Sequence, residues 1–278
     1  MVKEFIKYIY YFFYDYLIIL KGLNNNSNFI IILPRFVSIL IKKVYIFDRI
    51  NNNFFSQIIR NKYDLITVFE IFCEESYNLK RLKRWDEIIE NYNSIIHNNL
   101  SPLIIDCGSN IGSSSNYFYR IFDKSSIAMI EPDLQNMKYS EINTPRIKKK
   151  LFNKAISCEE KIFNFDNELQ DNRAFQINEY GKSKIEGITI EQVIRIMGDN
   201  VKPFLIKIDV EGFEKELFKK NTKWLDSFDI IIIEIHDWML PNYANSENFL
   251  NAIASSNSFG VKRDIIISGE NLICLKIY

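Results

Sequence analysis

The chain has 278 residues, of which 47% are hydrophobic and 25% are charged, so it can bury a large core and its composition excludes general disorder. Lysine plus arginine equals aspartate plus glutamate, 35 against 35, so net charge does not draw the chain to a phosphate backbone and we expect no nucleic-acid partner. The four cysteines lie far apart and form no CxxC pair. This spacing excludes a metal knuckle and a disulfide framework and favours a reducing, cytoplasmic compartment.

Residues 5–20 read FIKYIYYFFYDYLIIL, a strongly apolar and aromatic stretch interrupted by Lys7 and Asp15. It is shorter than the about 20 apolar residues that a membrane-spanning helix needs. No small-residue cleavage site follows it, as one would follow a signal peptide. We expect a helix that packs on the main domain or on a second subunit. Its tyrosines and lysines also suit a helix in a membrane interface, so peripheral membrane contact through residues 1–20 stays open.

Asparagine clusters at 24–26, 51–53 and 98–99 divide the first hundred residues, because asparagine favours turns. The segments between them look helical. Residues 63–97, for example, are rich in Leu, Ile, Glu, Lys and Arg and contain no Gly or Pro. We therefore expect residues 1–100 to form a mainly helical N-terminal region, and no chemical motif indicates its role.

From Pro102 onward, short apolar runs alternate with amphipathic segments. Strands are predicted at 103–107, 127–131, 149–156, 204–210, 229–235, about 259–268 and 271–278, and helices at 111–122, 133–142, 189–197, 213–220 and 245–255. Near-continuous runs of Ile, Leu and Val indicate a parallel sheet covered on both faces. The short Gly269-Glu270 connection allows only an antiparallel pair. Residues 101–278 are therefore predicted to form a Rossmann-like α/β domain, with a mostly parallel seven-stranded sheet and an antiparallel C-terminal hairpin.

A glycine corner follows the first of these strands and reads DCGSNIG at residues 106–112. Gly108 can take a positive φ and lets a ligand approach the backbone, and Gly112 permits close contact between helix and strand. The corner lacks the middle glycine of GxGxxG, which admits a pyrophosphate, so a nucleotide-dependent oxidoreductase is disfavoured. The acid at the strand end suits a cationic ligand without phosphates, such as a sulfonium-bearing amino acid joined to adenosine. The alternative explanation is an ordinary strand–turn–helix corner.

Glu131 and Pro132 end the second strand of the predicted sheet. A carboxylate in this position can accept hydrogen bonds from both ribose hydroxyls of an adenosine, and Pro132 stops the strand. An acid at a strand end is common by itself. Together with the glycine corner, it indicates a nucleoside-binding site.

Two further strand ends carry polar residues where a sheet covered on both faces should be apolar. Lys207 and Asp209 share one face of their strand, Glu234 and His236 share one face of theirs, and Glu211 follows Asp209. Unpaired buried charge is costly, so these groups should meet one another, a ligand or a cation. Three explanations stay open: a Lys207–Asp209 ion pair that only organises the sheet, a general base at His236 or Asp209, and a divalent-metal site drawn from Asp209, Glu211, Glu234 or His236.

Six blocks of the sequence, taken together, resemble the FkbM family of methyltransferases. They are LIIDCGSNIGSSSNYF (103–118), IEPD (130–133), NKAIS (153–157), GITIEQVI (187–194), LIKIDVEGFEKEL (205–217) and IIIEIH (231–236). The blocks occur in the family's order, and the resemblance covers roughly residues 101–278. The first hundred residues lie outside it. The chain departs from the family at Glu191, where relatives commonly carry aspartate in a TLD-like motif.

The resemblance implies a class I methyltransferase that transfers a methyl group from S-adenosylmethionine, usually to a hydroxyl of a sugar or another natural-product intermediate. It places cofactor contacts at Asp106, Gly108, Asn110, Gly112 and Glu131, with Asn153 and Ala155 near the adenine edge, and we add Ser109 and Pro132 from the same two motifs. It places Asp209, Glu211 and His236 on the acceptor side, as the candidate catalytic residues.

The expected function is therefore O-methylation of a sugar, a glycan or another small-molecule acceptor. A divalent metal stays possible, and the sequence does not indicate an oligomeric state. The alternative is a non-catalytic binding or scaffold protein in a biosynthetic assembly. Turnover that is lost on His236→Ala or Asp209→Ala would exclude that alternative.

Overall fold

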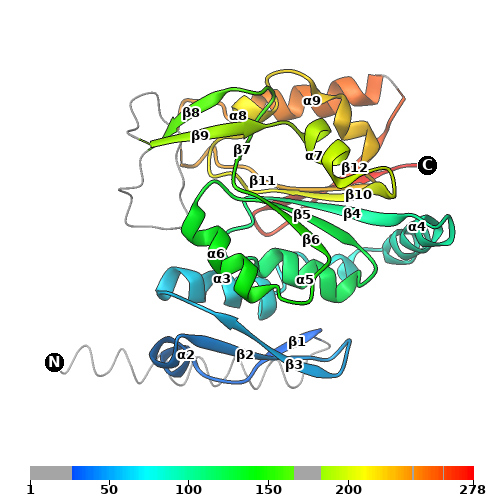
Figure 1. The fold of residues 1–278 in the computed structure, drawn as a ribbon. Coiled ribbons are helices and arrows are strands. Elements are labelled where there is room, and N and C mark those ends of the chain that lie inside the picture. The colour runs from blue at the N-terminus through cyan, green and yellow to red at the C-terminus, as the bar shows by residue number, and fades with distance from the viewer. Residues whose placement is uncertain (1–26, 166–182, 240, 259) are drawn as a thin grey trace.

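A seven-stranded sheet lies at the centre of the protein in a computed structural model, which describes residues 27–165, 183–239, 241–258 and 260–278 (Figure 1). The strand order is β12-β13-β11-β10-β4-β5-β6. The parallel strands are β4 (Ser101–Cys107), β5 (Ser126–Ile130), β6 (Lys149–Phe152), β10 (Val201–Ile208) and β11 (Ile230–Glu234). The C-terminal hairpin of β12 (Arg263–Ser268) and β13 (Asn271–Lys276) joins β11 in antiparallel orientation. The predicted mostly parallel sheet with its C-terminal hairpin is confirmed.

Helices cover both faces of this sheet (Figure 1). One face carries α5 (Ser113–Ile121) and α6 (Leu134–Asn143), and the other carries α7 (Ile190–Met197), α8 (Glu214–Leu217), η2 (Thr222–Ser227) and α9 (Glu247–Ser258). Successive side chains of a strand point to opposite faces, so Ile104 belongs to one hydrophobic core while Leu103 and Ile105 belong to the other. This two-core arrangement is the reason that the strands read as unbroken apolar runs.

The N-terminal region contains a second sheet that the sequence did not predict. β1 (Phe29–Ile31), β2 (Lys43–Asp48) and β3 (Asn53–Ile58) form it in antiparallel pairs, with α2 (Arg35–Ile41) between the first two strands. The expectation of helices between the asparagine clusters is wrong for these strands. The reason is visible in β2, where Val44, Ile46 and Asp48 are buried and their neighbours are not, the period of two that a strand requires.

Helices follow this sheet, as predicted for residues 63–97: α3 (Lys62–Phe72), the short η1 (Leu79–Arg81) and α4 (Trp85–His97). The N-terminal sheet and α3 share one hydrophobic core with the central sheet. The rings of Phe29 and Tyr117, for example, lie 5.3 Å apart between centroids. The region outside the family resemblance is thus packed directly onto α5.

The strand predicted at 149–156 is divided in the structure. β6 ends at Phe152, and β7 (Ala155–Ile156) belongs to a third sheet of order β7-β9-β8, with β8 (Ile162–Phe165) and β9 (Ser183–Ile188). Asn153 lies at the break and donates hydrogen bonds to the backbone oxygens of Glu131 (3.0 Å) and Pro132 (2.8 Å). These bonds hold the chain as it leaves the central sheet.

Within the described residues, none of the helices is both long and apolar enough to cross a membrane. The helix predicted at residues 5–20 lies outside the described residues.

Candidate active site

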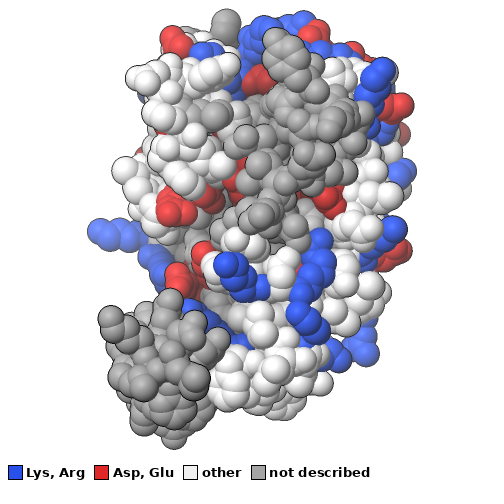
Figure 2. Space-filling model, turned by 90° about the vertical axis from the view of Figure 1, so that its left-hand side faces the viewer, with Lys and Arg blue, Asp and Glu red and all other residues white. Residues whose placement is uncertain are grey.

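The parallel strands of the central sheet end at one edge, and the predicted polar residues lie there. Figure 2 looks onto this edge and shows acidic side chains gathered around the middle of the face. Two adjoining cavities open at this edge, one of about 60 Å³ and one of about 620 Å³. Gly108, Asn110, Asp209 and Glu211 line both cavities. The glycine corner and the end of β10 therefore form the boundary between them.

The glycine corner needs its glycines for different reasons. Gly108 has a φ of +76°, and a Cβ added there would lie 1.8 Å from the backbone oxygen of Asp209. Gly112 has a φ of +85° and precedes α5, where an added Cβ would lie 3.1 Å from Ser140 and Thr144 of the α6 end. Gly108 thus allows the ends of β4 and β10 to approach each other at the edge where the cavities open, and Gly112 allows α5 to pack against α6.

Asp106 lies beneath the corner and is completely buried. Its carboxylate accepts hydrogen bonds from the hydroxyls of Ser114 and Ser115, both at 2.6 Å, and lies 3.3 Å from Lys207 Nζ. Asp106 is not among the described residues that line the two cavities. Its contacts are with the protein interior, which makes it a residue that positions the corner.

Lys207 joins the two strand ends. Its Nζ lies 3.2 Å from Asp209 and donates to the backbone oxygen of Gly108 at 2.8 Å. Burial lowers the pKa of Lys207, but the charges of Asp209 and Asp106 outweigh this effect and hold the pKa well above its ordinary value. The predicted Lys207–Asp209 ion pair is present, and it also includes Asp106.

The smaller cavity has a carboxylate on one wall. Glu131 is 4% exposed and accepts hydrogen bonds from the backbone nitrogens of Asn110 (2.8 Å) and Asp133 (3.0 Å) and from the side chain of Asn136 (3.2 Å). Burial raises the pKa of Glu131 to about 7, although the backbone bonds from Asp133 and Asn110 act in the opposite direction. Three donors therefore hold the carboxylate in one orientation on the wall of the cavity.

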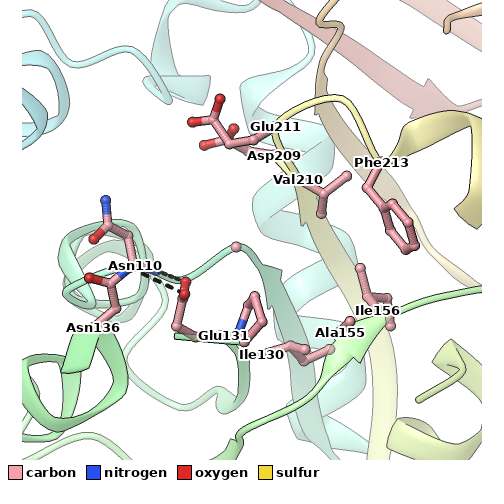
Figure 3. Close-up of a pocket in the computed structure, with 12 residues that line it drawn as sticks. Asn110, Ile130, Glu131, Asn136, Ala155, Ile156, Asp209, Val210, Glu211 and Phe213 are labelled. Carbon is pink, nitrogen blue, oxygen red and sulfur yellow. Dashed lines mark hydrogen bonds between the residues drawn. The ribbon is translucent and has the colours of Figure 1, made fainter. Parts of the chain in front are cut away.

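The other walls of this cavity are apolar or acidic. Figure 3 shows Glu131 and Asn110 on one side of it and Asp209 and Glu211 on the other. Its remaining lining residues are Gly108, Ile130, Pro132, Asn136, Ala155, Ile156, Val210 and Phe213. An apolar slot with one carboxylate at its mouth and further acids opposite suits an adenosyl group that carries a positive charge nearby.

His236 lies among four carboxylates at the end of β11. The imidazole is 1% exposed, with Nδ1 2.5 Å from Glu214 and Nε2 3.3 Å from Glu234 and 3.6 Å from Asp209. Nε2 is also 3.8 Å from Glu211, whose backbone has a φ of +49°. Burial lowers the pKa of His236, but the bonds to Glu214 and Glu234 outweigh it and raise the pKa to about 11.

Sequence reasoning missed Glu214. This carboxylate is fully buried at the start of α8, bonds Nδ1 of His236 and accepts from the side chain of Asn245. Its position three residues after Glu211 is the signal that was available in the sequence. Among the predicted cofactor residues, Gly108, Asn110, Glu131, Pro132 and Ala155 line the smaller cavity and Ser109 lines the larger one. Gly112 and Asn153 act through packing and backbone bonds.

A group of ligand atoms from Asp209, Glu234 and His236 lies within 4.8 Å of one another. Two carboxylates and an imidazole are a donor set that a divalent transition metal accepts. The glycine corner, Glu131 and the apolar walls of the smaller cavity are formed by other contacts and do not require such an ion.

The chain matches the family model described as the methyltransferase FkbM domain over residues 106–259. Hexuronic acid methyltransferase AglP of Haloferax volcanii is 33% identical over 70 residues, which are 25% of this chain and 29% of that protein, so the alignment spans less than a third of the relative.

Solved structures with a similar chain path include the precorrin-6y C5,15-methyltransferase of Geobacter metallireducens, with 11% identity and a TM-score of 0.34 over 76% of this chain and 96% of that chain. They also include a putative caffeoyl-CoA O-methyltransferase of Staphylococcus aureus, with 14% identity and a TM-score of 0.36 over 78% and 93% of the two chains. The family match covers more than half of the chain. The protein therefore belongs to the FkbM family of methyltransferases.

Proposed function

We propose that the protein transfers the methyl group of S-adenosylmethionine to a hydroxyl of a sugar, a glycan or another natural-product acceptor. The observation that carries this proposal is the pair of cavities that share Gly108, Asn110, Asp209 and Glu211. A small slot for the cofactor and a larger cavity for the acceptor meet at these residues. The name of the related AglP, a hexuronic acid methyltransferase, supports a sugar acceptor.

The adenosine end of the cofactor is assigned to the smaller cavity, and its sulfonium and amino-acid end to the boundary with the larger one. Glu131 is placed to accept hydrogen bonds from the ribose hydroxyls, and Ile156 and Phe213 offer apolar surface to the adenine. Asp209 and Glu211 provide the negative charge that the sulfonium and the ammonium group require. When bound, the cofactor supplies a methyl group on an activated leaving group, so the protein's main tasks are to align the acceptor and exclude water.

Asp209 is our candidate for the group that takes the proton of the acceptor hydroxyl. Its carboxylate lines both cavities. His236 is less suited to this task, because both of its ring nitrogens face carboxylates and its Nδ1 lies 2.5 Å from Glu214. We assign His236 to holding Asp209, Glu211 and Glu234 in place. A divalent ion held by Asp209, Glu234 and His236 is the alternative way to activate the hydroxyl.

The test combines cofactor binding with methyl transfer. Calorimetry should show binding of S-adenosylmethionine and S-adenosylhomocysteine and none of NAD, and radiolabelled methyl should pass to a member of a sugar and glycan panel. Asp209→Asn should lower kcat about 10²-fold or more, whereas the exposed Asp123→Asn should leave it unchanged. Loss of activity on chelation, restored by Mn²⁺, would favour the metal alternative.

Two outcomes would contradict the proposal. Folded protein that does not bind S-adenosylhomocysteine would remove the cofactor assignment. Binding of the cofactor without turnover on any acceptor of the panel would indicate a non-catalytic binding protein.

A further inference from the structure

The N-terminal sheet forms an end layer of the molecule, on the far side of α3 and α5 from the central sheet (Figure 1). The inner face of this layer belongs to the shared core through Val44 and Ile46 of β2. Side chains alternate along a strand, so Tyr45 and Phe47 lie on the outer face. The pairing of Phe47 with Phe54 places β3 on the same outer face.

Large apolar side chains in and beside this sheet are exposed rather than buried. Leu40 at the end of α2 is 75% exposed, Phe54 of β3 is 70% exposed, and Tyr45 of β2 is 40% exposed. Further exposed apolar residues of the same stretch are Ile32, Ile41 and Ile50. Single apolar residues on a surface are ordinary, but a group of them in one layer indicates an interaction surface.

The same stretch of the chain is basic. Residues 27–63 contain six basic side chains and one acidic one, Asp48, which is buried and paired with Arg120. The basic residues are Arg35, Lys42, Lys43, Arg49, Arg60 and Lys62. The formal net charge of the whole chain is zero, so this layer carries a positive excess that other parts of the molecule balance.

The three lysines of this stretch have no ion pair with an acidic residue in the part of the chain that the structure describes. Lys42 donates to a backbone oxygen at 2.7 Å. The Nζ atoms of Lys43 and Lys62 lie 5.4 and 4.8 Å from the ring centroids of Tyr45 and Tyr63. Lysines elsewhere on the surface pair with glutamates. The charge of these three lysines therefore stays available to a binding partner.

Aliphatic and aromatic side chains next to lysines match the surface of a lipid bilayer. Apolar side chains enter the boundary of the acyl chains, tyrosines lie at the level of the headgroups, and lysines attract anionic lipids. A second copy of the chain fits less well, because a symmetric contact would bring the lysines of the two copies together. The sequence at residues 5–20 is also apolar and rich in tyrosine, and it precedes β1 of this sheet.

We propose that this layer docks on the surface of a membrane that contains anionic lipids. The docking face consists of Leu40, Lys42, Lys43, Tyr45, Phe54 and Lys62. Helix α3 joins this face to the larger cavity, because it begins at Lys62 and its residues Thr67 and Ile71 line the cavity. Docking therefore holds that cavity close to the lipid surface. The inference stands on the docking face alone and does not depend on the proposed function.

The experiment measures sedimentation of the full chain with vesicles of phosphatidylcholine alone and of phosphatidylcholine mixed with phosphatidylglycerol. We expect the partition coefficient to be at least about tenfold higher for the anionic vesicles, because each lysine near a negative surface adds to binding. The difference should shrink as salt is added, since salt screens the lysines from the headgroups.

The double variant Leu40→Ser with Phe54→Ser tests the apolar part of the docking face. The partition coefficient on anionic vesicles should fall at least about tenfold, because two large side chains no longer enter the bilayer. The matched control is Ile265→Ser with Ile267→Ser, two positions on β12 that are 49% and 77% exposed, and it should leave the coefficient unchanged. Circular dichroism checks that each variant keeps its fold.

The double variant Lys43→Gln with Lys62→Gln tests the charge of the docking face. The partition coefficient should fall at least about fivefold on anionic vesicles and stay the same on neutral ones. Lys202→Gln with Lys223→Gln, two exposed positions outside the docking face, is the matched control and should change neither coefficient.

Three results would overturn the proposal. The first is a full chain that does not sediment with anionic vesicles. The second is vesicle binding that either double variant of the docking face leaves unchanged, which would assign membrane contact to other residues. The third is a dimer in light scattering that Leu40→Ser with Phe54→Ser converts to a monomer, which would assign the face to a second copy. None of these measurements uses the cofactor, so failure here is distinguishable from failure of the proposed function.

Discussion

Glu131 shows that burial of a single carboxylate lowers the stability of the folded state. Its carboxylate is buried, and its pKa is raised from 4.5 to about 7. In the unfolded chain it ionises near its ordinary value, so between pH 4.5 and 7 the folded state binds more protons than the unfolded state. The free energy of unfolding therefore falls as pH rises through this window, and the penalty is complete above it. A group held at such a cost is a candidate for function.

We predict that S-adenosylhomocysteine binds more tightly as pH rises through about 7, where Glu131 loses its proton. Only the ionised form of Glu131 can accept hydrogen bonds from both ribose hydroxyls. Below pH 7, the Kd should therefore increase by up to about tenfold for each unit by which the pH is lowered. Glu131→Gln should bind at least about tenfold more weakly at pH 8 and lose this pH dependence. Calorimetry across this range checks the prediction. Wild-type affinity that does not change with pH would count against it.

Asp106 and Lys207 show what residue patterns alone could and could not predict. The acid at the end of β4 was visible in the sequence, as was the shared face of Lys207 and Asp209. The sequence does not show that Lys207 lies between the carboxylates of Asp106 and Asp209, because this position depends on the pairing of β4 with β10. Asp106 consequently faces the interior, whereas Gly108 and Glu131 line the smaller cavity.

At the scale of elements, the predicted strands that correspond to β4, β5, β10 and β11 were located well because both of their faces are buried along most of their length. An unbroken apolar run of this kind has few alternatives. The N-terminal strands were missed, since alternation over six residues in β2 competes with helix-favouring neighbours. The break at Asn153 was also missed, because the side-chain bonds that cause it reach residues 22 and 21 positions away.

Asn143, the last residue of α6, joins the N-terminal sheet to the glycine corner. Its side chain accepts from the backbone nitrogen of Ile58 at 2.7 Å and donates to the backbone oxygens of Ile58 (3.1 Å) and Ile111 (3.0 Å). One buried side chain thus satisfies β3 and the glycine corner together.

We predict that Asn143→Ala lowers the free energy of unfolding by about 2–4 kcal/mol, because it leaves buried backbone groups unpaired. Asn98→Ala, at an exposed position after α4, should change it by less than about 0.5 kcal/mol. Urea denaturation followed by circular dichroism measures both. Equally small effects of the two substitutions on the free energy of unfolding would show that the hydrogen bonds of Asn143 contribute little to stability.

At the scale of the whole molecule, the N-terminal region and the methyltransferase part share one core. Phe72 and Tyr77 pack with Tyr117 of α5, with ring centroids 6.0 and 6.4 Å apart, and Tyr77 also lies 5.3 Å from Phe118. Removing the first hundred residues would expose this apolar face of α5 to water.

We therefore predict that a fragment of residues 101–278 does not fold to a stable monomer. It should elute as aggregate in size-exclusion chromatography and bind the dye ANS, which reports exposed apolar surface. The full chain under the same buffer is the control. A monomeric fragment that melts cooperatively would show that the methyltransferase part folds independently of the N-terminal region.

The sequence by itself determined the central sheet, the glycine corner, the carboxylate that follows β5 and the family, because each depends on residues that are neighbours in the chain or lie within one strand–turn–helix unit. Tertiary structure alone decided that Asp106 faces inward, that Glu214 holds His236, and that residues from 67–81 line the larger cavity. These contacts join elements far apart in sequence, and such pairings are set by packing of the whole core.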